Sequence, residues 1–205
     1  MSVNENNETK ERRFDPEEHL PMFQTDRFYC LDGGFASSLQ KFHHEQVEND
    51  PLWSCRALHT NPEAVIKTHE AFIKAGANII STNTYQAHHE LFKKHISDFK
   101  NPTLDSHLIM ENAVKLADQA VVNVTGAGRR NNHLVAGSVG PYGACQGDGS
   151  EYTGSYIKTM SREALKEWHR DRIKRLTFSN PVDIIAIETI PSYVEALAVL
   201  DALEE

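Results

Sequence analysis

The amino-acid sequence predicts an α/β fold with four strand–helix units arranged around a parallel sheet. Four apolar runs recur at similar intervals along the 205 residues, and each run ends on a small polar or acidic group. At least one segment with helical periodicity lies between consecutive runs. Strands that are apolar throughout and alternate with helices are typical of parallel sheets covered by helices. Chemistry in such folds collects at the carboxyl ends of the strands, so we expect a site there.

The first predicted strand covers residues 29–32 and ends on Asp32. The pair Gly33-Gly34 permits a tight turn directly after this carboxylate, because glycine adopts backbone conformations that other residues avoid. A short helix is predicted over residues 35–42. Further along, Leu52-Trp53 is expected to pack back onto the core.

The helix before the second strand carries the clearest local signals. Asn61 is a natural N-cap, Pro62 fits the first helical position, and Gly76 supplies a left-handed stop. Its inward stripe is Val65, His69, Phe72 and Ile73. The second strand is predicted to follow almost at once, over residues 77–85. A junction this short is typical of α/β proteins.

The third unit is predicted from a helix near residues 104–122 and a strand over residues 134–139. The strand leads into Gly140-Pro141. Glycine lets other atoms approach the backbone closely, and proline makes the chain rigid where it leaves the strand. A long loop is expected over residues 144–159.

The fourth unit begins with a helix that Ser161 is expected to cap. The helix presents one face that includes Leu165, Trp168 and Leu176. The fourth strand is predicted over residues 183–187 and ends at Glu188. Ser192 and Glu195 have the spacing of a capping box for a final helix.

The composition argues against two kinds of partner. A formal net charge of −8 does not suit a nucleic-acid surface, and the basic stretch 170–175 is interpreted as a solvated helix face. No run approaches the ~20 apolar residues that cross a bilayer. Residues 1–25 are interpreted as a flexible polar extension without a signal-peptide core, and residues 26–205 as the folded domain. These features predict a cytoplasmic protein that binds neither nucleic acid nor membrane.

The cysteines and histidines do not suggest a metal site in this chain. Cys30, Cys55 and Cys145 form no Cys-x-x-Cys pair and are interpreted as reduced thiols. The adjacent pairs His43-His44 and His88-His89 diverge in direction on a helix, so the two imidazoles of a pair seldom bind one ion. No metal-binding motif with the usual spacing is present.

Asp32 and Glu188 are the strongest candidates for a site, because each follows an apolar strand directly. A carboxylate there can hold a ligand ammonium group or act as an acid or base, since a low dielectric strengthens both roles. The structural alternatives are a helix cap for Asp32 and an arginine partner for Glu188.

Polar side chains also follow the second strand, at Thr82-Asn83-Thr84. They can orient a polar substrate or satisfy the backbone of a turn, and the pattern alone favours the turn. Gly140-Pro141 likewise fits either a ligand approach or a simple turn.

Taken together, these segments resemble the homocysteine S-methyltransferase family over about residues 27–203. The pattern is closest to the branch that uses S-methylmethionine or S-adenosylmethionine as methyl donor. The motifs occur in the family's order. They are Leu31-Asp-Gly-Gly34, Asp50-Pro-Leu-Trp-Ser54 with Asn61-Pro-Glu63, Thr82-Asn-Thr-Tyr-Gln-Ala87, Gly137-Ser-Val-Gly-Pro-Tyr-Gly143 with Asp148-Gly-Ser-Glu-Tyr152, and Glu188-Thr189.

The resemblance implies a (β/α)8 TIM barrel, of which this chain covers about the first four units. It implies methyl transfer from a sulfonium donor to homocysteine, which gives methionine. The acidic groups and the first turn would hold the ammonium group of homocysteine, and the polar residues after the second strand would line the pocket where the two sulfur atoms meet. The implied substrate-binding residues are Asp32, Gly33, Thr82, Asn83, Gln86, Gly140 and Glu188.

The resemblance also implies zinc, which holds homocysteine as a thiolate. The family's zinc ligands are three cysteines from the second half of the barrel, two of them in a Gly-Gly-Cys-Cys motif. The sequence stops at Glu205 without them, and Cys30, Cys55 and Cys145 lie in other motifs. We therefore expect the zinc ligands, and methyl transfer by this chain alone, to be absent.

Two other interpretations remain open at this point. A non-catalytic half-barrel could act as an interaction or regulatory protein and associate with itself or another chain through open sheet edges. A different barrel enzyme with Glu188 as a carboxylate base is the second alternative.

Overall fold

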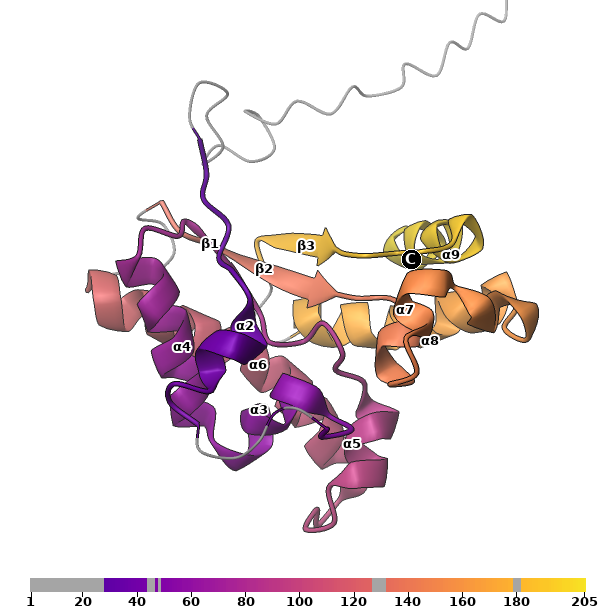
Figure 1. The fold of residues 1–205 in the computed structure, drawn as a ribbon, viewed down its shortest axis with the longest axis horizontal. Coiled ribbons are helices and arrows are strands. Elements are labelled where there is room, and N and C mark those ends of the chain that lie inside the picture. Colours follow the sequence, from indigo (N-terminus) through magenta and orange to yellow (C-terminus); the bar gives the residue numbers. More distant parts are fainter. Residues whose placement is uncertain (1–27, 44–46, 48, 127–131, 179–181) are drawn as a thin grey trace, which may run out of the picture.

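The computed structural model contains a small parallel sheet with helices packed along it (Figure 1). The strands are β1 (Ile79–Ser81), β2 (Leu134–Val139) and β3 (Ile184–Ile187), in the order β1-β2-β3. The predicted α/β class and parallel sheet are therefore confirmed. The structure describes residues 28–43, 47, 49–126, 132–178 and 182–205. The predicted extension over residues 1–25 lies outside these ranges and stays a prediction.

The register of the sheet aligns the carboxyl ends of the strands. Ser81 at the end of β1 lies opposite Ala136, and Val139 at the end of β2 lies opposite Ile187. Both pairings are parallel, as expected when helices connect successive strands. The residues that follow β1, β2 and β3 consequently emerge at one edge of the sheet.

The predicted first strand is wrong as an extended strand, because residues 29–32 contribute a single parallel bridge between Leu31 and Ile79. The side chain of Asn78 explains the short pairing: its Oδ1 accepts the backbone N–H of Cys30 at 3.2 Å. The backbone N–H groups of Asn78 and Ile79 both donate to the Cys30 oxygen. A regular ladder does not form, but Asp32 still arrives beside the end of β1.

The helices connect these strands in chain order. They are α2 (Phe35–Leu39), α3 (Ala57–Thr60), α4 (Pro62–Lys74), α5 (His89–His95), α6 (Pro102–Thr125), α7 (Ser150–Thr153), α8 (Arg162–Phe178) and α9 (Tyr193–Leu203), with 3-10 turns η1 (Trp53–Arg56), η2 (Tyr142–Cys145) and η3 (Ser155–Lys158).

The predicted start and stop of α4 are confirmed. The side chain of Asn61 accepts the N–H of Ala64 at 3.1 Å, Pro62 opens the helix, and Gly76 follows it with a φ of 105°. Helix α6 is slightly longer than predicted, because Asn101 caps its first turn and Gly126 ends it in the left-handed conformation.

Two local predictions in the second half are wrong. The expected loop over residues 144–159 contains α7 and η3. Gly149 precedes α7 and Gly154 separates it from η3, both in the left-handed conformation. Ser192 makes no side-chain cap for α9, and Glu195 points into the protein instead of back to the helix start. The predicted cap of α8 is confirmed, since Ser161 Oγ accepts the N–H of Ala164 at 3.2 Å.

One large part of the core lies between the sheet and helices α4, α6, α8 and α9. Helix α6 packs between α4 and α8, and α8 packs against α9 (Figure 1). Side chains from β1, β2 and all four helices meet there. They include Ile73, Ile80, Val114, Val121, Val135, Val139, Ile173, Leu176 and Val199.

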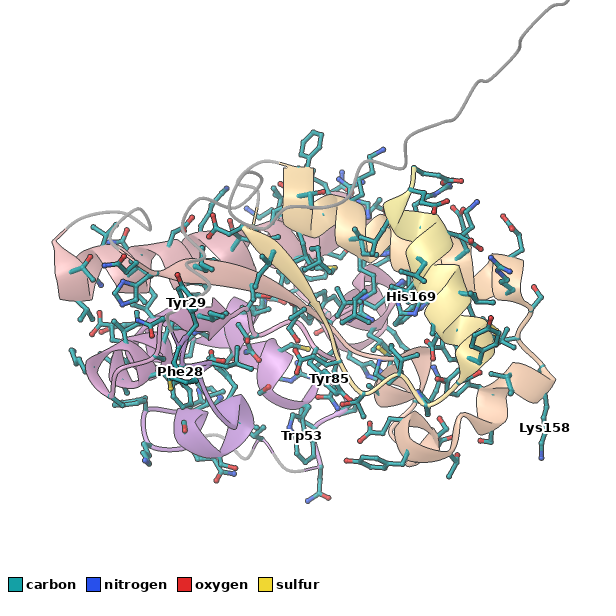
Figure 2. The ribbon with its side chains drawn as sticks, turned by 90° about the horizontal axis from the view of Figure 1, so that it is seen from above. Phe28, Tyr29, Trp53, Tyr85, Lys158 and His169 are labelled. Atoms are coloured by element: carbon teal, nitrogen blue, oxygen red, sulfur yellow. The ribbon has the colours of Figure 1, made fainter. Side chains whose placement is uncertain are left out.

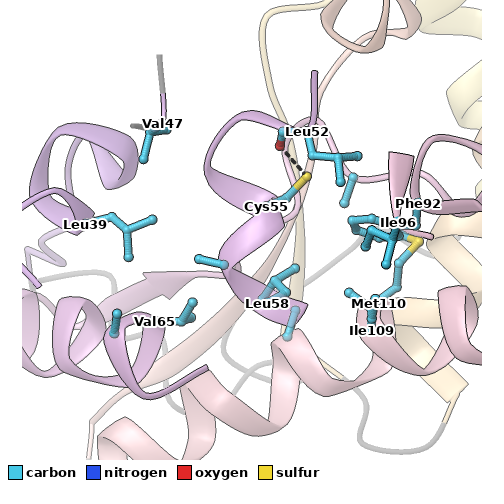
Figure 3. Close-up of a cluster of buried hydrophobic side chains, with 14 residues drawn as sticks. Leu39, Val47, Leu52, Cys55, Leu58, Val65, Phe92, Ile96, Ile109 and Met110 are labelled. Carbon is cyan, nitrogen blue, oxygen red and sulfur yellow. Dashed lines mark hydrogen bonds between the residues drawn. The ribbon is translucent and has the colours of Figure 1, made fainter. Parts of the chain in front are cut away.

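A second core cluster holds the segment between the first turn and α6 (Figure 3). Leu52 is fully buried within it, and Cys55 donates its Sγ–H to the Leu52 oxygen at 2.7 Å. The expectation that Leu52-Trp53 packs on the core is therefore right for Leu52 and wrong for Trp53. Trp53 is 39% exposed, because its positive φ of 48° turns the side chain away from the cluster.

The two edges of the sheet carry little cover within the part of the chain that the structure describes. One edge has only the Leu31 bridge, and Ile187 on β3 is 40% exposed at the other. Association through these edges stays a prediction. Among the described helices, none combines the length and apolar character that crossing a membrane requires.

Candidate functional site

The ends of the strands border a cleft of about 670 Å³. Of the seven residues predicted to bind substrate, the cleft brings together Asp32, Gly33, Thr82, Asn83, Gln86 and Glu188, whereas Gly140 lies buried outside its lining. The other lining residues come from the first turn and α2, from η1, from the ends of β1 and β2, and from the segment around α7. They are Leu31, Gly34, Phe35, Ala36, Ser37, Trp53, Ser54, Ser81, Tyr85, Ser138, Gly147, Gly149, Glu151 and Tyr152.

Asp32 is fixed across the end of the sheet. Its Oδ2 accepts the backbone N–H of Ser81 at 2.8 Å, and its own N–H donates to the Ile79 oxygen. It does not cap α2, so the structural alternative of a helix cap does not describe its contacts. Burial, together with the smaller effect of the Glu188 charge, raises the pKa of Asp32 to about 6 against the hydrogen bonds from Ser81.

Glu188 enters the cleft from the end of β3. Ser138 Oγ donates to Glu188 Oε1 at 2.7 Å, and the Glu188 N–H donates to the Val139 oxygen. Thr189 follows it with a φ of 56°, an uncommon conformation for a β-branched residue. Ser138, and not the arginine that the structural alternative invoked, holds the carboxylate among the described residues.

The charge of the cleft favours cations. Asp32, Glu151 and Glu188 contribute carboxylates, and the lining residues within the described chain include no Lys, Arg or His. Aromatic side chains of Phe35, Trp53, Tyr85 and Tyr152 complete the walls. Aromatic faces attract ammonium and sulfonium cations through their quadrupole, and clustered carboxylates attract them through their charge.

Trp53 was not predicted to belong to the site, although it lies on the cleft with Tyr85 (Figure 2). The sequence signal was an apolar residue beside Leu52, which favours the core. Its backbone conformation is what redirects the indole, and a left-handed residue outside glycine has no reliable sequence signature. Such outliers are often found at binding sites.

Thr82 and Asn83 are held by the protein itself. Thr82 Oγ1 lies 2.6 Å from Thr84 Oγ1 and accepts the N–H of Ser138, and Thr84 Oγ1 donates to the Ser138 oxygen. Asn83 exchanges hydrogen bonds with Ser54, whose Oγ donates to Asn83 Oδ1 at 2.8 Å. These bonds tie β1 to β2 and to η1, so both residues shape the cleft wall while most of their hydrogen-bonding capacity is engaged.

Gln86 lies further along the same wall. Its Nε2 donates to the Ala144 oxygen at 3.4 Å, which is a long hydrogen bond, and its side chain is half-buried. A long bond is readily exchanged for a ligand contact. Gln86 is therefore the predicted polar residue after β1 with the least engaged side chain.

Arg172 holds the backbone behind the cleft, although the sequence placed it on a solvated helix face. It is fully buried, and it donates to the oxygens of Thr84, Tyr85 and Gly140 at 2.8–3.0 Å. Its guanidinium also lies 4.6 Å from the ring centroid of Trp168. The interpretation of residues 170–175 is thus wrong for Arg172, because the carbonyl groups after β1 and β2 supply partners that a charge pattern does not reveal.

Gly140 supports the site by close packing, and we expect Gly140→Ala to cost about 1–3 kcal/mol of unfolding free energy. An added Cβ would lie 2.6 Å from both the ring and the backbone oxygen of Tyr85. Gly34→Ala is the matched control, because Gly34 has a φ of −59° and open space around it. Urea denaturation of both variants measures the difference. Equal stability of the two would contradict the close-packing argument.

The described cysteines do not form a thiolate metal site. Burial raises the pKa of Cys145 to about 12 and also raises that of Cys55, which disfavours the thiolate form. Cys145 donates to the Gln86 oxygen at 3.1 Å, and Cys30 is exposed and distant in sequence from both. These three cysteines therefore lack the surroundings that stabilise a metal-bound thiolate.

The chain is similar to known proteins of one family. The family profile of homocysteine S-methyltransferase matches residues 29–205. A betaine-homocysteine S-methyltransferase of Drosophila melanogaster is 43% identical over 173 residues, which are 82% of this chain and 51% of that protein. Homocysteine S-methyltransferase 1 of Brassica oleracea var. italica is 40% identical over 184 residues, which are 85% of this chain and 53% of that protein.

A solved structure is similar as well. The crystal structure of the homocysteine methyltransferase MmuM from Escherichia coli in its metallated form gives a TM-score of 0.76 at 33% identity, and the match covers 93% of this chain and 62% of that one. The chain spans about half the length of the curated relatives it matches. The name of the Drosophila relative includes betaine, whereas that of the Brassica relative includes no methyl donor, so the branch of the family is left open.

Proposed function

The chain belongs to the homocysteine S-methyltransferase family, and from that premise we propose that it forms the amino-acid-binding part of an enzyme that methylates homocysteine to methionine. The observation that carries this proposal is the acidic cleft at the strand ends. Asp32 and Glu188 face it from opposite edges of the sheet, and the lining residues of the described chain bring no basic side chain. An ammonium group is the ligand group that this arrangement favours.

The same premise supports a larger architecture. We propose that residues 26–205 form the first units of a (β/α)8 barrel. The parallel order β1-β2-β3, with Leu31 beside β1, matches successive strands of such a barrel. The candidate site then lies where barrel enzymes carry theirs, at the carboxyl ends of the strands.

Each predicted residue has a role in this proposal. Glu188, oriented by Ser138, and Asp32 hold the ammonium group of homocysteine. Gly33 leaves room for the ligand at the first turn, and Gly140 sets the position of Tyr85 from behind. The remaining polar residues form the wall along which the side chain of homocysteine extends. They are Thr82, Asn83 and Gln86.

The methyl donor is proposed to be a cation, with S-methylmethionine or S-adenosylmethionine as the leading candidates. Methyl transfer forms a bond between the homocysteine sulfur and the methyl carbon and breaks the donor's bond to that carbon. The donor thereby loses its positive charge, and the thiol proton leaves. The aromatic walls and carboxylates favour a sulfonium donor, and they would equally favour the quaternary ammonium of betaine. The comparisons lend no support to the alternative of a non-catalytic interaction protein.

The test of the amino-acid site is Glu188→Gln. We expect this variant to weaken homocysteine binding by the chain about tenfold or more, because a hydrogen bond to a charged group is worth about 1.5–3 kcal/mol. Isothermal titration calorimetry measures the change. Glu163→Gln, which removes an equal charge from an exposed position on α8, should bind like the parent chain.

A second ligand makes the measurement specific. The desamino analogue 4-sulfanylbutanoate keeps the thiol and the carboxylate but lacks the ammonium group. Glu188→Gln should leave its binding unchanged or improve it. If the variant weakens both ligands alike, or neither, Glu188 does not hold the ammonium group. Methionine formation from each of the three donors then tests the reaction itself.

A further inference from the structure

Three side chains from three helices converge outside the cleft at the strand ends. His89 begins α5, His107 lies on α6, and Asp171 lies on α8. His89 Nδ1 is 2.8 Å from Asp171 Oδ2, and His107 Nε2 is 3.6 Å from the same oxygen. One donor atom from each residue lies within 4.8 Å of the others. None of the three lines the cleft.

His89 lies between two carboxylates, and either a second ring proton or a bound cation satisfies both contacts. Its Nε2 lies 3.0 Å from Glu90 Oε1, and its Nδ1 faces Asp171 Oδ2. A neutral imidazole carries only one N–H, so it can donate to one of these carboxylates and not to both. His89 Nδ1 and Asp171 Oδ2 are also buried atoms without a well-aligned hydrogen-bond partner. A cation between them would satisfy both.

We propose that His89, His107 and Asp171 bind a divalent transition-metal ion of the zinc class. Two imidazoles and one carboxylate are a donor set that zinc accepts, with a fourth position open to water. Ligand atoms around a tetrahedral zinc ion lie about 3.3 Å apart, which follows from bond lengths near 2.0 Å. The distances of Asp171 Oδ2 from His89 Nδ1 (2.8 Å) and from His107 Nε2 (3.6 Å) lie on either side of that value. Binding of an ion therefore needs only small side-chain rotations.

The surroundings support this set of ligands. Arg175 approaches the other oxygen of Asp171, with Nη2 at 3.7 Å from Oδ1, and leaves Oδ2 to the histidines. Glu90 can take the Nε2–H of His89, the outer contact that usually orients a metal-binding histidine.

His88, which precedes His89 in the sequence, makes other contacts and is not a ligand of the proposed site. His88 Nδ1 accepts the N–H of Glu90 at 3.2 Å and caps α5. The ring of His88 stacks on Trp168 with a centroid distance of 4.4 Å and an interplanar angle of 2°. The ring centroids of His88 and His89 lie 4.3 Å apart. Trp168 is therefore close enough to report metal binding by its fluorescence.

The sequence expectation of no metal site in this chain overlooked this set. The three residues lie on separate helices, and no spacing rule connects them. The ligands are not thiolates and lie outside the acidic cleft, so the proposed site is separate from the zinc that the family implies. The proposal does not depend on the chain's methyl-transfer activity.

The experiment is a titration of the chelator-treated chain with Zn²⁺ and, separately, with Co²⁺. We expect one ion per chain, a change in tryptophan fluorescence, and the visible absorption of four-coordinate cobalt. His107→Gln and Asp171→Asn should each weaken binding by at least about tenfold, the smallest loss that even an outer partner of a metal ligand causes. Circular dichroism checks that both variants fold.

His59→Gln is the matched control. His59 Nε2 lies 3.0 Å from Asp98 Oδ1, a histidine–carboxylate pair of similar distance to which no third ligand belongs among the described residues. This variant should bind metal like the parent chain. The proposal is overturned if the parent chain takes up no zinc, if His107→Gln binds as tightly as the parent, or if His59→Gln causes the larger loss.

Discussion

Arg172→Met is expected to lower the free energy of unfolding by about 3–5 kcal/mol, the largest effect of any single substitution considered for this chain. Methionine fills much of the same volume but donates no hydrogen bond. The oxygens of Thr84, Tyr85 and Gly140 would then lose their shared donor inside the protein. An unpaired buried acceptor costs about 1–3 kcal/mol, and the three losses do not add fully because water can reach some of them. Urea denaturation followed by circular dichroism measures the change.

Arg172→Lys separates charge from geometry. Lysine keeps the positive charge but replaces the planar fork of donors by one ammonium group, so it cannot reach all three oxygens in the same directions. We expect the free energy of unfolding of Arg172→Lys to lie between the values of the parent chain and of Arg172→Met. Arg172→Lys should also weaken homocysteine binding if the carbonyl groups position the cleft wall.

Arg170→Met is the control on the same helix. Arg170 is exposed and, among the described residues, forms ion pairs with Glu167 and Glu205, so its removal should change stability by under about 1 kcal/mol. If Arg172→Met costs no more than Arg170→Met, the buried guanidinium does not hold the strand ends together.

The fold was predictable where local signals and burial agreed. The cap at Asn61, the stop at Gly76 and the apolar run of β2 each encode their structure within a few residues. The failures share a physical cause, which is a side chain that bonds across the fold. The side-chain oxygen of Asn78 takes the place of a backbone oxygen as the acceptor for Cys30 in the predicted first strand.

Glu195 illustrates the same limit more strongly. Its spacing from Ser192 suggests a capping box, but its carboxylate accepts the N–H of Tyr142 at 2.7 Å and the hydroxyl of Tyr156, and it lies 2.9 Å from His169 Nε2. Burial alone would raise the pKa of Glu195, yet these hydrogen bonds outweigh it and hold the pKa below its ordinary value. Partners that are distant in sequence cannot be recognised from local spacing.

The candidate site could be predicted from the sequence about as well as the fold. Residues that follow apolar strands could be expected at one sheet edge, and six of the predicted residues do line one cleft. Trp53 and Arg172 were missed, because a left-handed tryptophan and a buried arginine both contradict the usual behaviour of their residue types.

Asp32→Asn is expected to stabilise the chain by about 1–3 kcal/mol above pH 7 and to have little effect below pH 4. Burial raises the pKa of Asp32 to about 6, from an unfolded value near 3.9. Between these values the folded chain binds more protons than the unfolded chain. Stability therefore falls as pH rises through this window, and above it the folded protein carries the full cost of a poorly solvated carboxylate. Asparagine avoids that cost and can still accept the Ser81 N–H.

Urea denaturation of parent and variant between pH 4 and pH 8 tests this expectation. Asp148→Asn is the control, because Asp148 also accepts a backbone N–H, from Ser150, but is exposed and has a lowered pKa. Its effect on stability should have the opposite sign. A parent–variant difference for Asp32→Asn that does not change with pH would contradict the raised pKa.

The cost of Asp32 connects stability with binding. A cation in the cleft would stabilise the carboxylate and lower its pKa, so a ligand with an ammonium group should bind more tightly as pH rises through 6. In Asp32→Asn this pH dependence should disappear and the binding of homocysteine should weaken, although the free chain is more stable. A variant that gained stability and kept its affinity for homocysteine would mean that Asp32 strains the cleft without holding the ligand, and Glu188 alone would then remain as the ammonium partner.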